Sequence, residues 1–331
     1  MEKQLLPQSF HFTDLTPDFI LDAIETTGIR VESGLLALNS YENRVYQFMD
    51  DDRKRYVVKF YRPQRWTSEQ IQEEHQFALE LHHHEIPLVA PLIFNGNTLH
   101  QSEGYQFTLF PSAGGRQFEV DNLDQLEWMG RFIGRIHAVG STQPFTHRAE
   151  LTVATHLHQP LQILQTSELV PTHLHRPFFT ILEQVVALAE KPMNTVTFKP
   201  IRLHGDCHPG NILWRDGPTF VDLDDCRNGP AIQDLWMMLS GDRQQQLLQL
   251  DTLVSAYEEF HHFDHQQLQL IEPLRAMRMI HYMAWLEQRW ADPAFPRAFP
   301  WFAEDKYWEN QILALKEQFS ALHEAPLKLM P

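Results

Sequence analysis

The sequence predicts an α+β fold with two lobes, a small, mixed, β-rich N-terminal lobe and a larger, mainly helical C-terminal lobe. Its 331 residues exceed the common size of one domain and are enough for two lobes with substantial cores. In the first third of the chain, runs of β-branched and aromatic residues alternate with turn residues, whereas apolar residues at helical spacing dominate the rest. We expect the first lobe over residues 1–111 and the second over residues 112–331.

The first lobe should contain one leading helix and one sheet. The pattern of apolar residues predicts a small helix over residues 14–26 and consecutive strands over residues 28–60. A second helix is predicted over residues 68–81, because apolar residues recur there at helical spacing. Strand-like sequence at residues 87–91 and 107–112 then completes this lobe.

One lysine lies in a strongly β-prone run, Y-V-V-K-F-Y over residues 56–61. A lysine in such a run is costly unless an anion compensates its charge, so Lys59 predicts an ion-pair partner. The glutamates of the helix over residues 68–81 are the candidates. We choose Glu74, because it opens an E-x-x-x-A-x-x-L arrangement in which the glutamate would point back at the strand.

The turn that precedes the Lys59 strand is the place where a glycine-rich loop would bind phosphate, but it lacks the glycines of such a loop. No G-x-G-x-x-G stands before Lys59, and residues 38–48 form an extended run interrupted by small polar residues. Ser40 and Asn43 could turn the chain there and offer hydroxyl, amide and backbone N–H donors to phosphate oxygens. The alternative is an ordinary β-turn in which both side chains serve only the backbone.

The second lobe should begin at a hinge. Residues 110–113 are expected to join the lobes, and Gly114-Gly115 would permit the turn into the second lobe. Periodic apolar residues then predict a helix over residues 123–137. The proline-rich stretch 292–300 is interpreted as an ordered aromatic loop rather than a linker.

The most informative pattern is His204-Gly205-Asp206, followed by Asn211 and Asp222. Two short apolar runs around Asp216-Gly217 predict a hairpin that returns Asp222 to the side of Asn211. Phosphoryl transfer from ATP needs one carboxylate that accepts the proton of the attacking hydroxyl and two oxygen ligands for Mg²⁺. Asp206 would be the base, and Asn211 and Asp222 the metal ligands.

Lys59 fits the same chemistry, because the reaction also needs a cation on the nucleotide phosphates. The spacing matches a kinase catalytic loop, with Gly205 where eukaryotic protein kinases usually carry arginine. Asp234 follows too soon for a long activation segment. We interpret it as an acceptor for the backbone of the catalytic loop, with helix N-capping as the alternative.

Composition sets looser limits. The formal net charge of −16 argues against a nucleic-acid-binding surface and is compatible with a basic substrate. No apolar stretch approaches the roughly 20 residues of a membrane helix, and the N-terminal residues lack a signal-peptide pattern. We expect a cytoplasmic monomer that contacts neither membrane nor nucleic acid. The scattered histidines do not predict a zinc site, and Cys207 and Cys226 are interpreted as small apolar core residues, with a redox pair as the alternative.

The chain resembles the aminoglycoside phosphotransferase and choline kinase-like superfamily, and within it a group of bacterial serine/threonine protein kinases. The segments that carry the resemblance are N-S-Y-E-N-R-V-Y at 39–46, V-V-K-F-Y-R-P at 57–63, R-L-H-G-D-C-H at 202–208, F-V-D-L-D-D at 220–225 and W-A-D-P-A-F-P at 290–296. The resemblance implies a bilobal protein-kinase-like fold and transfer of phosphate from ATP to a protein Ser or Thr in stress responses. It also implies that Ser40 contacts ATP.

Two alternatives remain open at this point. A small-molecule kinase would phosphorylate an amino alcohol, a sugar or an aminoglycoside-like compound, with Trp285, Trp290, Phe295 and Trp301 as an aromatic wall. A catalytically inactive scaffold is disfavoured, because each group that binds ATP has a candidate residue.

Overall fold

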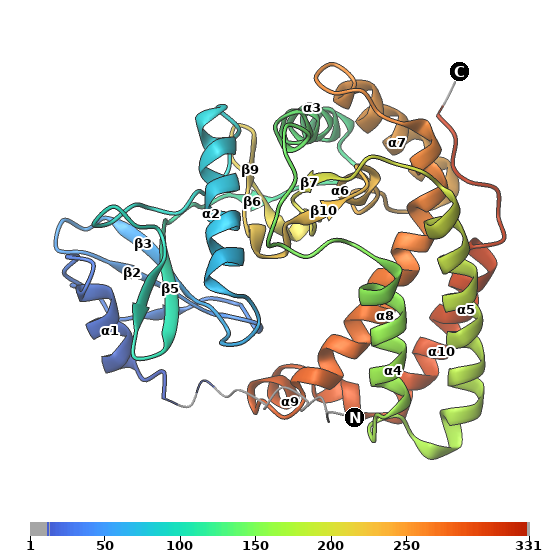
Figure 1. The fold of residues 1–331 in the computed structure, drawn as a ribbon, viewed down its shortest axis with the longest axis horizontal. Helices are drawn as coiled ribbons and strands as arrows, with labels where there is room; N and C mark the ends of the chain where they lie inside the picture. Colours follow the sequence, from blue (N-terminus) through green and yellow to red (C-terminus); the bar gives the residue numbers. More distant parts are fainter. Residues whose placement is uncertain (1–11, 13, 330–331) are drawn as a thin grey trace. The chain divides into compact units, whose positions relative to one another are not determined.

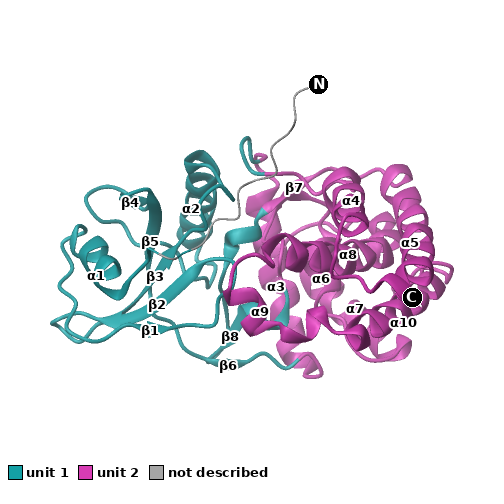
Figure 2. Cartoon of the chain, turned by 90° about the horizontal axis from the view of Figure 1, so that it is seen from below, with its two compact units in different colours: residues 1–119, 145–148, 208–226 teal, residues 120–144, 149–207, 227–331 magenta. Residues whose placement is uncertain are grey.

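A computed structural model describes residues 12 and 14–329, which form two compact units (Figure 2). Unit 1 consists of residues 1–119, 145–148 and 208–226, and unit 2 of residues 120–144, 149–207 and 227–331. The units are interleaved in sequence rather than divided at one point. The expected lobe boundary after residue 111 stays a prediction.

Unit 1 contains two helices and two sheets among its described residues (Figure 1). Its elements are α1 (Pro17–Glu25), β1 (Leu36–Ala37), β2 (Arg44–Met49), β3 (Arg55–Phe60), α2 (Ser68–His83), β4 (His100–Ser102), β5 (Tyr105–Pro111), β6 (Arg116–Gln117), the 3₁₀ turn η3 (Pro209–Asn211), β8 (Ile212–Trp214), β9 (Pro218–Phe220) and the 3₁₀ turn η4 (Leu223–Asp225). The predicted helices over residues 14–26 and 68–81 are confirmed as α1 and α2.

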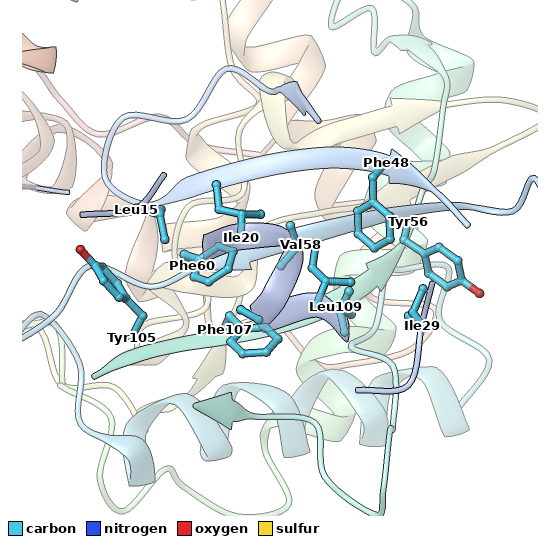
Figure 3. Packing of buried hydrophobic residues seen from close by; sticks show 12 residues of the cluster. Leu15, Ile20, Ile29, Phe48, Tyr56, Val58, Phe60, Tyr105, Phe107 and Leu109 are labelled. Atoms are coloured by element: carbon cyan, nitrogen blue, oxygen red, sulfur yellow. The ribbon is translucent and has the colours of Figure 1, made fainter. Parts of the chain in front are cut away.

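The larger sheet of unit 1 has the strand order β1-β2-β3-β5-β4, with antiparallel neighbours throughout. Side chains alternate between its two faces. Tyr56, Val58 and Phe60 of β3 point toward α1 and form a core with its apolar residues (Figure 3). Lys59, on the intervening position, therefore points to the opposite face, toward α2.

The smaller sheet of unit 1 has the order β6-β8-β9. Strands β8 and β9 pair antiparallel, with Ile212 opposite Phe220, so the predicted hairpin is confirmed. Its turn places Asp216 at φ 55° and Gly217 at φ 145°. Positive φ is the reason that this turn carries an Asp-Gly pair.

Unit 2 is mainly helical. Its elements are α3 (Leu123–Gly140), the π-helical turn η1 (Ala154–His158), α4 (Gln159–Gln165), the 3₁₀ turn η2 (Thr172–Leu174), α5 (His175–Thr195), β7 (Ile201–Leu203), β10 (Arg227–Gly229), α6 (Ile232–Trp236), α7 (Arg243–Tyr257), the 3₁₀ turn η5 (His265–Leu270), α8 (Ile271–Arg289), α9 (Ala294–Ala298), the 3₁₀ turn η6 (Pro300–Ala303) and α10 (Asp305–Ala321). Helix α5 packs against α8 and α10 (Figure 1). The α+β fold class is thus confirmed, and α3 matches the helix predicted over residues 123–137.

Close packing of α3 on α7 depends on glycine. Gly130 and Gly134 lie one turn apart on the side of α3 that faces α7, where a Cβ on Gly134 would lie 2.6 Å from the carbonyl oxygen of Tyr257. The backbones can approach because neither position carries a side chain. Strands β7 and β10 pair antiparallel beside these helices, and the chain leaves β7 directly into His204.

Two local predictions need correction. Residues 87–91 form no regular strand; Leu88 makes only an isolated parallel bridge to Phe220. The stretch 292–300 is not a loop throughout, because it contains the short helix α9. The buried Asp292 lies two residues before this helix and accepts a hydrogen bond from the backbone N–H of Ala294 at 3.0 Å. No helix among residues 12 and 14–329 is long and apolar enough to span a bilayer.

Candidate functional site

The centre of the site in unit 1 is Lys59, which is buried and surrounded by carboxylates. Its Nζ lies 2.9 Å from Asp224 Oδ1, 3.2 Å from Asp222 Oδ1 and 3.8 Å from Glu74 Oε1. Strand β3 delivers the lysine and α2 delivers the glutamate. Helix α2 begins at a capping box in which Thr67 and Gln70 bond each other's backbone N–H groups, and this fixes where the helix starts relative to the strand.

The two aspartates come from the chain after the β8–β9 hairpin. The backbone N–H of Val221 donates to the carbonyl oxygen of Asn211 at 3.0 Å, so Asp222 follows directly beside Asn211 as predicted. Asp222 then adopts φ 61°, an unusual backbone for aspartate that turns the chain into η4. As a result, the Asp222 side chain is 56% exposed whereas that of Asp224 is 5% exposed.

Asp224 is also paired with arginine. Arg65 contacts Asp224 with Nη1 and lies 3.0 Å from Asp225 with Nη2. On its other side, Arg148 contacts the backbone carbonyl of Asp224, donates to that of Cys226 at 2.9 Å and lies 3.6 Å from Glu74. Asp224 is therefore a structural centre of unit 1, held by three cations.

Burial and charge act against each other at these groups. Burial alone would lower the pKa of Lys59, but Asp224, Asp222 and Glu74 outweigh it and hold that pKa well above its usual value. Burial raises the pKa of Glu74 to about 7, against the attraction of Lys59. Burial also opposes ionisation of Asp224, yet Arg65 and Lys59 lower its pKa to about 2. The positive charge of Lys59 is therefore compensated mainly by the negative charges of Asp224 and Asp222.

Glu73, the neighbour of Glu74, binds backbone N–H groups of another segment rather than a cation. Glu73 accepts hydrogen bonds from the backbone N–H groups of Thr146, His147 and Arg148 at 2.7, 2.8 and 2.7 Å. We call residues 145–148 the clasp segment. Because Glu73 holds its backbone, the segment presents the Arg148 guanidinium to the loop that contains Asp224, and so it fixes α2 and that loop together.

The turn before β2 is held by its own polar groups. Ser40 Oγ donates to the carbonyl oxygen of Asn43 at 3.3 Å, and Asn43 Oδ1 accepts from the backbone N–H of Arg62 at 3.0 Å. Arg62 Nε lies 3.1 Å from Glu42. These bonds fix the turn; contact of Ser40 with ATP stays a prediction.

In unit 2, the buried Asp234 organises the loop that carries Asp206. Its carboxylate accepts from the backbone N–H groups of His204 and Gly205 at 2.8 and 2.9 Å, and lies 3.0 Å from Nε2 of His137. Gly205 has φ 85°, a conformation that favours glycine. The prediction that Asp234 supports the loop backbone is confirmed. Helix N-capping is not its role, because α6 begins at Ile232.

Asp206 itself is partly exposed and is engaged by an arginine. Arg278, on α8, contacts Asp206 Oδ1 with Nη1. The side chains of Arg278 and Asp206 are 45% and 25% exposed. After Cys207 the chain passes from unit 2 into unit 1.

Sequence reasoning missed several residues of this arrangement. They are Arg65, Arg148 and Arg278, while the sequence leaves the roles of Asp224 and Asp225 open between a second Mg²⁺ ligand and a solvent-exposed or arginine-paired carboxylate. Asp224 follows Asp222 at an interval of two, so the D-x-D pattern was the available signal. The arginines meet their partners across 72 to 160 residues of chain, and no local pattern marks them.

Two other residues singled out in the sequence, Phe295 and Cys207, are buried in the core. Phe295 is fully buried and packs edge-on against Trp285, so it cannot face a ligand. Burial raises the pKa of the Cys207 thiol well above its usual value, and Asp234 adds to the effect, so the unreactive thiol is favoured. A metal ion could be held by three or more His, Cys, Asp or Glu side chains that lie close together. Among residues 12 and 14–329, the group that meets this condition is Asp50, Asp51 and Asp52.

Residues 35–271 match the phosphotransferase enzyme family, abbreviated APH. The chain belongs to the phosphotransferase enzyme family. It is 54% identical over 323 residues to stress response kinase A of Salmonella choleraesuis, with 98% of each chain covered. The identity and coverage are the same for a Salmonella typhimurium protein named serine/threonine protein kinase RdoA.

Solved structures agree on the fold of this family member. An amicoumacin kinase in complex with AMP-PNP, Ca²⁺ and Ami superimposes with a TM-score of 0.73 at 16% identity, covering 95% of this chain and 96% of that one. At such low identity the likeness concerns the fold alone. Membership of the family establishes a kinase-type phosphotransferase and leaves the acceptor to be determined.

Proposed function

We propose that the chain is a cytoplasmic serine/threonine protein kinase that transfers the γ-phosphate of Mg·ATP to a protein hydroxyl in a bacterial stress response. Lys59, paired with Glu74, and Ser40 would bind the nucleotide. Asp206 would accept the proton of the attacking hydroxyl. The observation that carries the phosphotransfer part is the buried lysine held among Asp224, Asp222 and Glu74.

The residues present fit a magnesium ion. Asp222 keeps more than half of its side chain exposed although it lies 3.2 Å from Lys59, and Asn211 is its neighbour through the Val221 backbone bond. A carboxylate and an amide oxygen suit Mg²⁺, which prefers oxygen ligands and keeps some of its water. Asn211 and Asp222 would therefore hold the ion. When bound, Mg²⁺ supplies positive charge to the phosphate oxygens.

The side chains of the protein hold the reacting groups in position. Asp234 fixes the backbone of His204 and Gly205, and so sets the direction in which the next residue, Asp206, leaves the loop. A carboxylate in a fixed position can orient a hydroxyl and take up its proton without paying for rearrangement at each turnover. Lys59 adds a fixed positive charge for the phosphates.

The acceptor is the part of the proposal that depends on similarity. It is supported by the 54% identity, over nearly the whole chain, to a protein named serine/threonine protein kinase. The second candidate, a small-molecule kinase, is favoured by the likeness in fold to an amicoumacin kinase. Since the identity to the protein kinase is far higher, we rank the protein acceptor first.

The test is transfer of labelled γ-phosphate from Mg·ATP to generic Ser/Thr-containing proteins and to a panel of small alcohols and amines. We expect phosphoserine or phosphothreonine with the wild type, and a loss of about 10²–10⁴-fold with Asp206→Asn. Asp222→Asn and removal of divalent ions with EDTA should also abolish transfer. A matched control is Asp216→Asn, since asparagine tolerates the positive φ of the hairpin turn.

The outcomes separate the candidates. Label in proteins that disappears with Asp206→Asn but persists with Asp216→Asn supports a protein kinase. Label in a small compound only would replace the proposal by the second candidate. Equal transfer by wild type and Asp206→Asn would remove Asp206 as the base.

A further inference from the structure

The arginine at the proposed base is the feature that the phosphotransfer reaction leaves unexplained. Arg278 Nη1 contacts Asp206 Oδ1, an oxygen that would receive the hydroxyl proton. Among residues 12 and 14–329, the carboxylate paired with Arg278 is that of Asp206 alone. An oxygen that already accepts a hydrogen bond from a guanidinium forms a weaker hydrogen bond with a substrate hydroxyl. Arg278 must therefore leave Asp206 Oδ1, or share it with the hydroxyl, when an acceptor binds.

The arginine belongs to a basic group within unit 2. His281 lies one turn further along α8, exposed, and its ring stacks on that of His156 at 5.0 Å between centroids. Arg227 Nη1 lies 2.6 Å from His156 Nε2. Because arginine only donates, Nε2 of His156 must accept, and its Nδ1, 2.8 Å from the Thr155 hydroxyl, can carry the ring proton.

This basic group is linked to the loop of Asp206 by the backbone as well. Arg227 begins β10 and pairs in register with Leu203, the last residue of β7, and Asp206 follows three residues later. Arg278 thus contacts the proposed base directly, and Arg227 lies on the strand paired with the one that precedes it.

We propose that Arg278 is a specificity-determining residue that masks Asp206 in the free enzyme and pairs with a carboxylate of the acceptor. The acceptor would be a Ser or Thr in an acidic segment of a protein, with Asp or Glu next to the hydroxyl. Pairing with that carboxylate draws the guanidinium from Asp206, and Oδ1 of Asp206 then accepts the hydroxyl proton. This inference rests on the proposed function, and it concerns the residues next to the acceptor hydroxyl, which the net charge of the chain does not identify.

The test uses pairs of peptides that differ only in the residues flanking one serine, glutamate in one and glutamine in the other. With the full-length wild type and Mg·ATP, kcat/KM should be at least about tenfold higher for the acidic peptide, as one charged hydrogen bond can supply. Arg278→Met should bring this ratio close to one. Arg278→Glu should reverse the preference toward peptides with lysine flanks.

A control separates specificity from general damage. Arg131 is also an arginine of unit 2 and pairs with Glu127 and Glu259. Arg131→Met should keep the wild-type ratio. A merely structural Arg278 would lower the rates for both peptides equally and leave the ratio unchanged, and that result would overturn the inference.

The same assay distinguishes this inference from the proposed function. Transfer to proteins and peptides without any preference for acidic flanks would overturn the inference and leave the protein kinase intact. Transfer to small compounds with none to proteins or peptides would overturn both.

Discussion

The buried Glu74 makes stability depend on pH in a defined direction. Its pKa is raised to about 7 in the folded protein, above the usual 4.5, so the folded state holds the proton more tightly than the unfolded chain. The stability contributed by the bound proton is complete below pH 4.5 and is lost as the pH rises through about 7. Glu74→Gln replaces the carboxyl group by a neutral one of the same shape, and should remove this loss.

The magnitude follows from the shift. One pKa unit corresponds to about 1.4 kcal/mol, so Glu74 should cost the wild type roughly 2 kcal/mol of unfolding free energy between pH 5 and pH 8. Near pH 5 the wild type and Glu74→Gln should be about equally stable. At pH 8 the variant should be more stable by on the order of 2 kcal/mol.

The assay is urea unfolding of both proteins at pH 5, 6, 7 and 8, evaluated as the difference between them. His75, whose pKa is lowered to about 3 by burial and by Lys59, stays neutral in both folded proteins over this range, so its titration in the unfolded chains is common to both and cancels in that difference. Asp224, with a pKa of about 2, contributes stability that is lost only as the pH falls below about 4.

Glu73→Gln is the matched control. Hydrogen bonds from the clasp segment outweigh burial and lower the pKa of Glu73, so its carboxylate stays ionised throughout this range. The control should be less stable than the wild type by a constant amount. Parallel curves for the wild type and Glu74→Gln from pH 5 to 8 would refute the reasoning.

Three further predictions concern stability and can be read by urea unfolding. Lys59→Met should lower the free energy of unfolding by about 3 kcal/mol, because it leaves buried carboxylates uncompensated. Arg116→Met breaks an ion pair that is more than half exposed on both sides and should lower it by under about 1 kcal/mol. Equal losses would contradict the buried network. Asp234→Ala should cost about 3–5 kcal/mol, since two buried backbone donors and His137 lose their acceptor, and a cost under about 1 kcal/mol would count against that role. Gly134→Ala should cost about 1–3 kcal/mol through its contact with a carbonyl of α7, while Gly34→Ala, with nothing within 4 Å, should stay within about 0.5 kcal/mol; similar effects at both would argue against close packing.

The parts of the fold that the sequence predicts are those with local patterns. Alternation in residues 56–61 identifies β3 and places Lys59 on the face opposite the core. The Asp216-Gly217 pair identifies the hairpin, because its positive φ values suit few other residues. The order of Asp206, Asn211 and Asp222 is likewise a property of a short stretch of chain.

The parts that sequence reasoning could not predict depend on distant partners. The D-x-D pattern does not say which aspartate turns inward; the φ of 61° at Asp222 decides it, and buries Asp224 against Lys59. Arg148 and Arg278 meet their carboxylates or carbonyls only after the chain has folded. The stretch 292–300 contains α9 although it is rich in proline, and the buried Asp292 just before the helix binds the backbone N–H of Ala294, a contact that no local pattern shows.

The clasp segment has a consequence for the order in which the protein can form during synthesis. Residues 145–148 and 208–226 belong to unit 1, but they leave the ribosome after α3 and, for the second stretch, after α4 and α5. Until residue 222 has been made, the nascent chain contains Lys59 and Glu74 without Asp222 and Asp224. Residues 1–119 therefore cannot reach their final charge balance while they are the newest part of the chain, and a fragment that stops at residue 119 would keep this imbalance permanently.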